Sequence, residues 1–241
     1  MSKSIEELKS LATQIRRDIL RMVHAVNSGH PGGSLGCVEY FTALYGKVMN
    51  YKFPFFIFVK GEDVFYLSNG HISPVFYSTL ARFGYFPVEE LSTFRKLNSR
   101  LQGHPTTHEH LEGIRMSSGS LGQGLSVGIG TALAKKIDGD QSLVYTLHGD
   151  GELQEGQIWE ALMFAAAKKV DNLISTIDYN GQQIDGSTEH VLSLGDLHAK
   201  LEAFGWEVIE EKNGNDLEAV IAALEFAKSK TGNGKPVAIM L

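Results

Sequence analysis

Short apolar runs alternate with segments of helical composition in the second half of this 241-residue chain, and this alternation constrains the fold more than any other feature. The runs expected to form strands are residues 143–148, 173–177, 206–209 and 236–241. Helices are expected between them at residues 157–169 and 216–228. Parallel strands need long connections, and helices usually supply them. The sequence therefore predicts an α/β fold, with an open, mostly parallel sheet and helices on both faces, in one domain over residues 1–241.

The first half is expected to begin with a long helix. Ser4 and Glu7 have the spacing of a capping box, and apolar residues then recur at helical spacing up to Val26. Glycine and proline at residues 28–33 are expected to end this helix. Further helices are expected at residues 38–48 and 125–136, and a short strand at residues 64–67.

Charge and composition exclude several classes of function. Lysine and arginine number 22 against 28 aspartates and glutamates, which gives a formal net charge of −6. Nucleic acid and anionic membranes are therefore not expected partners, because both require a basic surface. The N-terminus does not resemble a signal peptide, and no apolar run reaches the length of about 18 residues that a membrane helix requires. The single cysteine, Cys37, is expected to be buried and unreactive, and it fits a cytoplasmic protein.

Oxygen-bearing side chains follow two consecutive expected strands. Asp150 lies in a Gly-Asp-Gly turn, and Asp178 and Asn180 follow the next strand. Parallel strands end at the same edge of a sheet, where ligands of such folds bind, so these side chains are expected to meet. Carboxylate and amide oxygens are ligands that Mg²⁺ prefers when phosphates complete its coordination. The pattern predicts a magnesium and phosphate site at this edge.

Glycine-rich loops and histidines provide further candidates. Residues 119–124 match neither the dinucleotide fingerprint nor the Walker loop, and two interpretations stay open: a packing turn, or a backbone surface for a flat cofactor ring. Three histidines follow glycine in loops, which suggests imidazoles in one polar pocket: His30, His71 and His104. A zinc site formed by His104, His108 and His110 is the less favoured alternative, because no cysteine supports it.

Six motifs in order carry a resemblance to a known family. They are SGHPG at 28–32, LSNGH at 67–71, QGHP at 102–105, GSLGQG at 119–124, GDGELQEG at 149–156 and NGQQIDG at 180–186. Together they resemble the diphosphate-binding domain of transketolases, which depend on thiamine diphosphate. The resemblance extends from about residue 10 to the end of the chain. Related deoxyxylulose-phosphate synthases and 2-oxoacid dehydrogenase components share the metal motif. His71 in the sequence SNGH and His104 in the sequence QGHP favour transketolase over both.

The resemblance implies a role for each matching position. The implied metal ligands, for Mg²⁺ or for Ca²⁺ or Mn²⁺ in its place, are Asp150, Asn180 and the backbone carbonyl of Gln182. The implied thiamine diphosphate contacts are His71, Gly119, Leu121, Gly149, Gly151 and Asn180. The implied catalytic residues are His30 and His104, which face the reacting sugar carbons, and Glu155, in a carboxylate network across a subunit boundary. The implied reaction transfers a two-carbon ketol unit between sugar phosphates, as in the pentose phosphate pathway.

The motifs of the family's pyrimidine-binding domain are missing from this sequence. The resemblance therefore implies the N-terminal subunit of a split transketolase, which pairs with a C-terminal partner subunit in a heterotetramer with two copies of each. The sequence also ends before a loop that carries a further active-site histidine in the family, so either the chain is truncated or the site stays incomplete with its partner. The aromatic run at residues 53–59 departs from the family, and we favour a core strand there over an exposed partner surface.

Three alternatives remain open at this point. A non-catalytic or truncated relative would act as a partner-binding scaffold. A second alternative is a deoxyxylulose-phosphate synthase-like enzyme that also uses thiamine diphosphate. A magnesium enzyme without thiamine would need its own base and nucleophile, and we find no such arrangement. The split transketolase is the preferred interpretation.

Overall fold

The structure is a computed structural model that describes residues 3–52 and 60–241. The chain divides into two compact units. The histidine unit comprises Met1–Phe58, Gly70–Gly119 and Asn213–Leu224, and the sheet unit comprises Val59–Asn69, Ser120–Lys212 and Glu225–Leu241. The aromatic run at residues 53–59, with the strand expected there, lies outside the described residues. The expectation of one domain over the whole chain stays a prediction.

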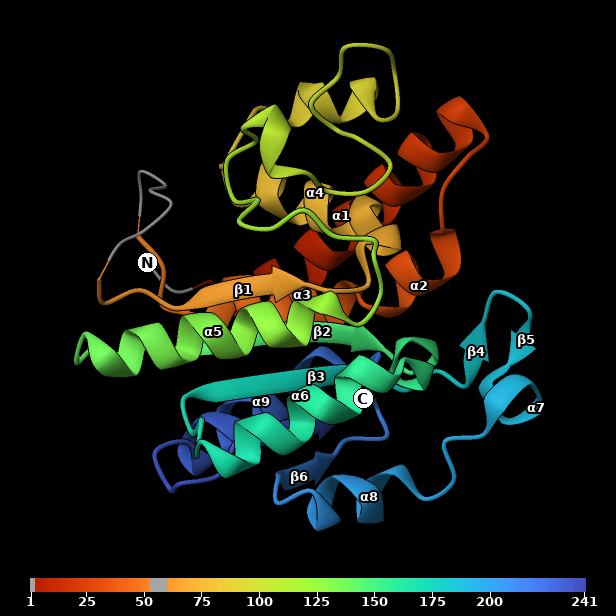
Figure 1. The fold of residues 1–241 in the computed structure, drawn as a ribbon. Coiled ribbons are helices and arrows are strands. Elements are labelled where there is room, and N and C mark those ends of the chain that lie inside the picture. Colours follow the sequence, from red (N-terminus) through yellow and green to blue (C-terminus); the bar gives the residue numbers. More distant parts are fainter. Residues whose placement is uncertain (1–2, 53–59) are drawn as a thin grey trace. The chain divides into compact units, whose positions relative to one another are not determined.

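The sheet unit is built on a five-stranded sheet in which all neighbouring strands are parallel (Figure 1). In spatial order the strands are β1 (Val64–Leu67), β2 (Val144–Gly149), β3 (Leu173–Asp178), β7 (Val237–Met240) and β6 (Glu207–Glu210). Strands β1 and β7 are buried at every position, and β2 and β3 at all but the last, which explains their continuous apolar runs. The register pairs Gly149 with Asp178, so β2 and β3 end side by side.

Helices and one small hairpin complete the sheet unit. They are α5 (Gln123–Ile137), α6 (Gly156–Ala167), α7 (Thr188–Leu192), α8 (Leu197–Ala203) and a hairpin of β4 (Gln182–Gln183) and β5 (Gly186–Ser187). Helix α5 packs against β1, β2, β3 and α6 (Figure 1). The close approach of α5 to the sheet depends on Gly128, because a Cβ there would lie 2.6 Å from the Thr146 methyl group.

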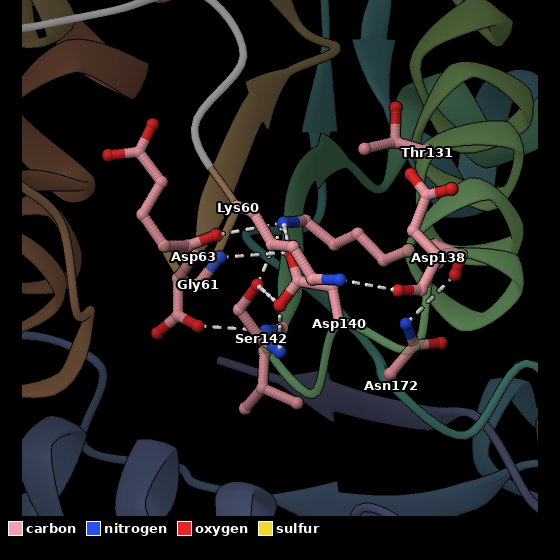
Figure 2. Close-up of polar contacts among 12 residues, drawn as sticks. Lys60, Gly61, Asp63, Thr131, Asp138, Asp140, Ser142 and Asn172 are labelled. Carbon is pink, nitrogen blue, oxygen red and sulfur yellow. Dashed lines mark hydrogen bonds and ion pairs between the residues drawn. The ribbon is translucent and has the colours of Figure 1, made fainter.

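A buried polar cluster ties together the loops that precede β1 and β2 (Figure 2). The Lys135 ammonium donates to the Glu62 carbonyl, the Asp140 carboxylate and the Ser142 hydroxyl, at 2.8–2.9 Å. Burial by itself would raise the pKa of Asp140, but hydrogen bonds from Ser142, Lys135 and Gly61 outweigh it and lower that pKa strongly. All three Lys135 protons therefore have acceptors, and the cluster is a structural anchor.

The histidine unit is mainly helical. Its helices are α1 (Ile5–Val26), α2 (Pro31–Gly36), α3 (Val38–Ala43), which continues as a π-helix at Leu44–Val48, and α4 (Ser73–Arg82), with short 3-10 helices at Gly70–Ile72, Val88–Thr93 and Thr107–Glu109. The capping box of α1 is present, since Glu7 N–H donates to Ser4 Oγ and Ser4 N–H donates to the Glu7 carboxylate. Buried Asp18 of α1 forms a bidentate ion pair with Arg82 of α4, which connects the two helices.

The predicted α/β fold with a parallel sheet is confirmed, and all five strands of the sheet lie within two residues of their expected positions. The other expected helices are also present, including α9 (Leu217–Lys230), whose residues belong to both units. Helices α2, α4, α7 and α8 were not expected. Nine of the ten residues of α4 are buried, so it has no polar face and no periodic pattern.

The burial of the single cysteine and the apolar length of the helices are also evident. Cys37 is buried, as expected. Across residues 3–52 and 60–241, no helix combines the length and the apolar composition needed to span a membrane.

Candidate functional site

Asp150 follows β2 directly and is fully buried. One of its carboxylate oxygens accepts the N–H of Gly151 at 2.8 Å, and the other accepts the N–H of Gly181 at 2.7 Å. The second bond reaches the loop that follows β3, so the structure brings Asp150 and the Asn180 loop together. The convergence of the two strand ends is the arrangement that the sequence led us to expect.

Asn180 and Gln182 lie in the exposed loop and hairpin that follow β3. The Asn180 amide nitrogen donates to Asp178 at 2.8 Å, and the Asn180 Oδ1 accepts the N–H of Gln182 at 2.9 Å. These bonds give the loop its shape, and the bond from Gly181 to Asp150 keeps the loop's amide, carboxylate and carbonyl oxygens near that carboxylate. The Gln182 side chain itself is exposed, so only its backbone is suited to the predicted role.

The donor set at this edge fits a hard divalent cation. Burial raises the pKa of Asp150, two backbone N–H groups act against that increase, and the nearby negative charge of Asp178 adds to it. A cation would offset both the burial of the Asp150 charge and its repulsion by Asp178. Within the described residues, no three His, Cys, Asp or Glu side chains form a metal cluster, so a metal here would depend on amide and carbonyl oxygens as well.

The glycines on either side of Asp150 leave room for a ligand and for close packing. A Cβ at Gly151 would lie 2.7 Å from the Gln183 Cβ, so the hairpin can lie against the turn only when residue 151 is glycine. Gly149 faces the Asn69 amide, and a Cβ there would be 3.9 Å from its nitrogen. Asn69 is 1% exposed, and neither atom of its amide has a hydrogen-bond partner among the described residues. An unsatisfied buried amide beside this turn is consistent with a polar ligand there.

Glu152 is a site residue that the sequence analysis did not single out. Its buried carboxylate accepts the Ser68 hydroxyl, the N–H of Gly122 at 2.7 Å and, more weakly, the N–H of Gly149 at 3.4 Å. Burial would raise the pKa of Glu152, but the nearby His148 imidazole, 3.6 Å away, and the hydrogen bonds of Ser68 and Gly122 lower it overall. One carboxylate therefore connects the ends of β1 and β2 with the glycine-rich loop.

Leu121 and Glu155 lie close to this network in the sheet unit. The Leu121 carbonyl accepts the side-chain N–H of Gln157 at 2.9 Å, which orients the backbone of the glycine-rich loop. Glu155 is the N-cap residue of α6 and its side chain is exposed. Exposure is compatible with a contact to another subunit, and the predicted carboxylate network stays a prediction.

The histidine unit gathers the three predicted histidines in two pairs of contacts. The rings of His30 and His71 lie with their centroids 5.0 Å apart. His104 lies against Gly119, where a Cβ would be 2.5 Å from the imidazole ring. Gly119 has a φ of +114°, a backbone conformation that favours glycine. The structure therefore pairs His30 with His71 and His104 with Gly119 inside one unit.

Arg95 is the second residue that the sequence analysis missed. Partial burial lowers the pKa of His30 and of His104, and in both cases the guanidinium charge of Arg95 lowers it further. The charge of His30 adds to the effect on His104, while a hydrogen bond at the His71 backbone opposes the effect on His30. Both imidazoles are thus held in the neutral form near neutral pH, and neutral imidazoles can accept protons.

The sequence of this chain matches a known protein family and named relatives. The family model described as "Transketolase, thiamine diphosphate binding domain" matches residues 8–241. The chain is 40% identical over its whole length to 6-deoxy-6-sulfo-D-fructose transketolase subunit SqwG of Clostridium sp. (strain MSTE9), and it covers 86% of that protein. It is also 40% identical to one of the subunits of the apulose-4-phosphate transketolase of Actinobacillus succinogenes, with 97% of this chain and 83% of that protein covered.

Solved structures of transketolases are also similar to this chain. A transketolase variant (R525L) from Pichia stipitis superimposes on 99% of this chain with a TM-score of 0.87 and 37% identity. Transketolase from Leishmania mexicana matches the whole chain with a TM-score of 0.87 and 32% identity. In both cases this chain spans 36% of the length of the solved protein, so roughly two thirds of each has no counterpart here.

Proposed function

Because this chain belongs to the family of transketolase thiamine diphosphate-binding domains, we propose that it is the N-terminal subunit of a split transketolase. In this proposal it transfers a two-carbon ketol unit between sugar phosphates, as in the pentose phosphate pathway, together with a C-terminal subunit that carries the pyrimidine-binding domain. The observation that carries the proposal is the near full-length match to two proteins that are themselves named transketolase subunits. The single cysteine supports a cytoplasmic location.

The proposed cofactor site uses residues of the sequence motifs. Asp150, Asn180 and the Gln182 carbonyl would hold Mg²⁺, or Ca²⁺ or Mn²⁺ in its place, and the buried, charge-crowded position of Asp150 supports this role. Gly151 and His71 would contact the diphosphate, and Gly119 and Leu121 would face the aminopyrimidine ring through their backbones. Gly149 and Asn180 would also contact the cofactor. When bound, thiamine diphosphate would supply the electron sink that ketol transfer needs.

The protein residues would handle protons and position the sugar. His30 and His104 would accept and return protons at the sugar hydroxyl groups, and the lowered pKa of each imidazole supports this role. Glu155, exposed at the start of α6, would join a carboxylate network that includes the neighbouring subunit. We propose two copies of each subunit in the assembly.

Calorimetric titration of thiamine diphosphate with Mg²⁺ tests the proposal. The cofactor is titrated into this chain alone and into the chain mixed with the product of the adjacent reading frame. We expect binding and ketol transfer only in the mixture. Robust activity of the single chain would contradict the split enzyme, and the absence of binding in both samples would favour the scaffold alternative.

Replacing His104 with alanine separates proton transfer from cofactor binding. We expect kcat of the assembled enzyme to fall by about 100-fold or more, the usual range for losing a proton-transfer group, while the cofactor Kd changes less than about threefold. His108→Ala is the matched control, because His108 is an exposed histidine of the same loop region. Equal losses of turnover and cofactor affinity would mean that His104 has a structural role.

Exposed apolar side chains on α5 and α6 are candidates for contact with a second, partner chain. Met163 and Phe164 on α6 are 61% and 46% exposed, and Val127 on the adjacent α5 is 39% exposed. Helices α5 and α6 pack against each other. Large exposed apolar side chains become favourable contacts when a partner chain covers them.

Met163→Glu is expected to prevent assembly without unfolding the chain. A charge at an exposed position costs the isolated chain less than about 0.5 kcal/mol, but it would be buried unpaired at a subunit contact. Size-exclusion chromatography of the mixed subunits measures assembly, and thermal denaturation measures folding. Phe226→Glu on α9 changes a comparably exposed apolar residue and is the control. Normal assembly of Met163→Glu would exclude this surface as the contact.

A further inference from the structure

Arg95 occupies an unusual position in the histidine unit. Its φ is +55°, in the left-handed region that arginine rarely adopts, and its N–H donates to the Leu101 carbonyl at 2.9 Å. The Arg95 Cζ lies 5.5 Å from the ring centroid of Phe94. A non-glycine residue in this conformation costs free energy, and such residues persist where the surrounding structure requires them.

The guanidinium of Arg95 contacts the two loops that carry His30 and His104. Its Nη1 donates to the hydroxyl of Ser28, two residues before His30, at 3.0 Å. On the other loop it packs directly on Gly103, the residue before His104, where a Cβ would lie 2.7 Å from the Arg95 Cζ. The side chain thus joins the SGH motif to the QGH motif, and Gly103 is the residue that admits it.

One donor of the Arg95 guanidinium makes no hydrogen bond. The Nε atom is buried and has no hydrogen-bond partner among the described residues. A structural arginine usually satisfies its donors, because an unpaired buried donor costs free energy. The hydrogen bonds of Arg95 alone therefore do not explain its position, and the groups that surround its positive charge need to be considered.

Few charged or titratable groups surround the two imidazoles in the described part of this unit. His30 faces Arg95 and His71, and His104 faces Arg95 and His30. Tyr77 of α4 also feels the charge of Arg95, but burial raises its pKa strongly and it stays neutral. No carboxylate of this part of the chain contributes to the pKa of either imidazole, so Arg95 supplies the permanent charge at this position.

We propose that Arg95 is a positioning residue for the histidine pair: its guanidinium holds the Ser28 and Gly103 loops together and presents a fixed positive charge to His30 and His104. It disfavours the imidazolium form of both rings, so that both are ready to accept a proton at neutral pH. The proposal refines the proposed function, since it concerns the same histidines, but its main test needs neither cofactor nor partner subunit.

NMR titration of the histidine rings in this chain provides that test. The imidazole signals of His30 and His104 are assigned from the variants His30→Asn and His104→Asn. We expect Arg95→Gln to raise both pKa values by about 0.5 to 1 pH unit, because a nearby cation is removed. Arg95→Lys keeps the charge and should retain most of the effect, although an ammonium group lacks the planar shape of the guanidinium that packs on Gly103.

Two further variants keep the result interpretable. Arg100→Gln removes a neighbouring arginine that pairs with Glu90 and Glu112, and we expect it to leave both histidine pKa values unchanged. Ser28→Ala removes the hydroxyl that holds the guanidinium and should give a smaller shift in the same direction, which provides a test if Arg95→Gln does not fold. Unchanged pKa values in folded Arg95→Gln, or an equal shift in Arg100→Gln, would overturn the proposal.

The assembled enzyme distinguishes this inference from the proposed function. If ketol transfer is present, the acidic limb of the kcat/KM profile of Arg95→Gln should move to higher pH by the shift seen in the NMR titration, whereas a merely structural loss would lower the profile without moving it. If ketol transfer is absent while the histidine shift is present, the proposed function fails and the role of Arg95 stands.

Discussion

Replacing Glu152 with alanine is expected to lower the free energy of unfolding by about 3–5 kcal/mol, the usual cost of breaking a buried charged network from one side. The carboxylate is 2% exposed and accepts hydrogen bonds from Ser68 and Gly122, which lie far from it in the chain. Its removal leaves those donors buried without an acceptor and leaves His148 without its nearby carboxylate, 3.6 Å away. Urea unfolding followed by circular dichroism measures the change.

Two variants define the cause of that loss. Glu152→Gln keeps the shape and one oxygen acceptor, so it should lose less stability than alanine. Glu160→Ala removes an exposed carboxylate from the following helix, and we expect a change within about 0.5 kcal/mol. If Glu152→Ala lowers the free energy of unfolding by less than about 1 kcal/mol, other contacts hold the ends of β1 and β2 and the glycine-rich loop together.

Asp150→Ala is expected to abolish Mg²⁺-dependent binding of thiamine diphosphate by the assembled subunits, with an affinity loss of more than about 100-fold. Loss of an outer partner of a metal ligand costs about 10–100-fold, and loss of a direct carboxylate ligand should cost more. Alanine also leaves the N–H groups of Gly151 and Gly181 without their acceptor. Calorimetric titration with and without Mg²⁺ measures the affinity.

Asp150→Asn separates the charge from the local scaffold. Asparagine retains one oxygen that can accept the N–H of Gly151 or of Gly181 but presents a donor to the other N–H, so the fold should lose less thermal stability than with alanine. Because burial raises the pKa of Asp150, its ionised form costs the metal-free fold free energy, and asparagine removes that cost. Asp185→Asn, at an exposed carboxylate of the nearby hairpin, should leave binding unchanged. Micromolar binding by Asp150→Ala would refute the metal assignment.

Local sequence patterns were sufficient for most of the secondary structure. The four residues of β1 are all buried and apolar, and the capping box of α1 depends only on residues three positions apart. The buried helix α4 lacks an amphipathic period, and the seven-residue α8 is too short for one to be evident. Patterns identify an element when one of its faces is polar, and they fail when the element is surrounded on all sides.

Candidate ligands at strand ends were also readable from the chain. Asp150 and Asn180 follow consecutive strands, and the parallel register alone brings their loops together, as the bond from Gly181 to Asp150 shows. A packing turn was one of two interpretations of the glycine-rich loop, and Gly119 lies in close contact with His104; Gly151, which was expected to let a phosphate approach, lies in close contact with Gln183. Their proposed contacts with a cofactor remain to be tested.

Tertiary structure alone decided the roles of Glu152 and Arg95. In the sequence, Glu152 is one more residue of a turn, and Arg95 is one of several arginines. Their functions come from Ser68, 84 positions before Glu152, and from Ser28, 67 positions before Arg95. A buried charge is defined by the partners that packing brings to it, and no local pattern encodes partners so distant in the chain. The chemistry of the motifs could therefore be read in advance, while the residues that hold those motifs in place became visible only in the folded chain.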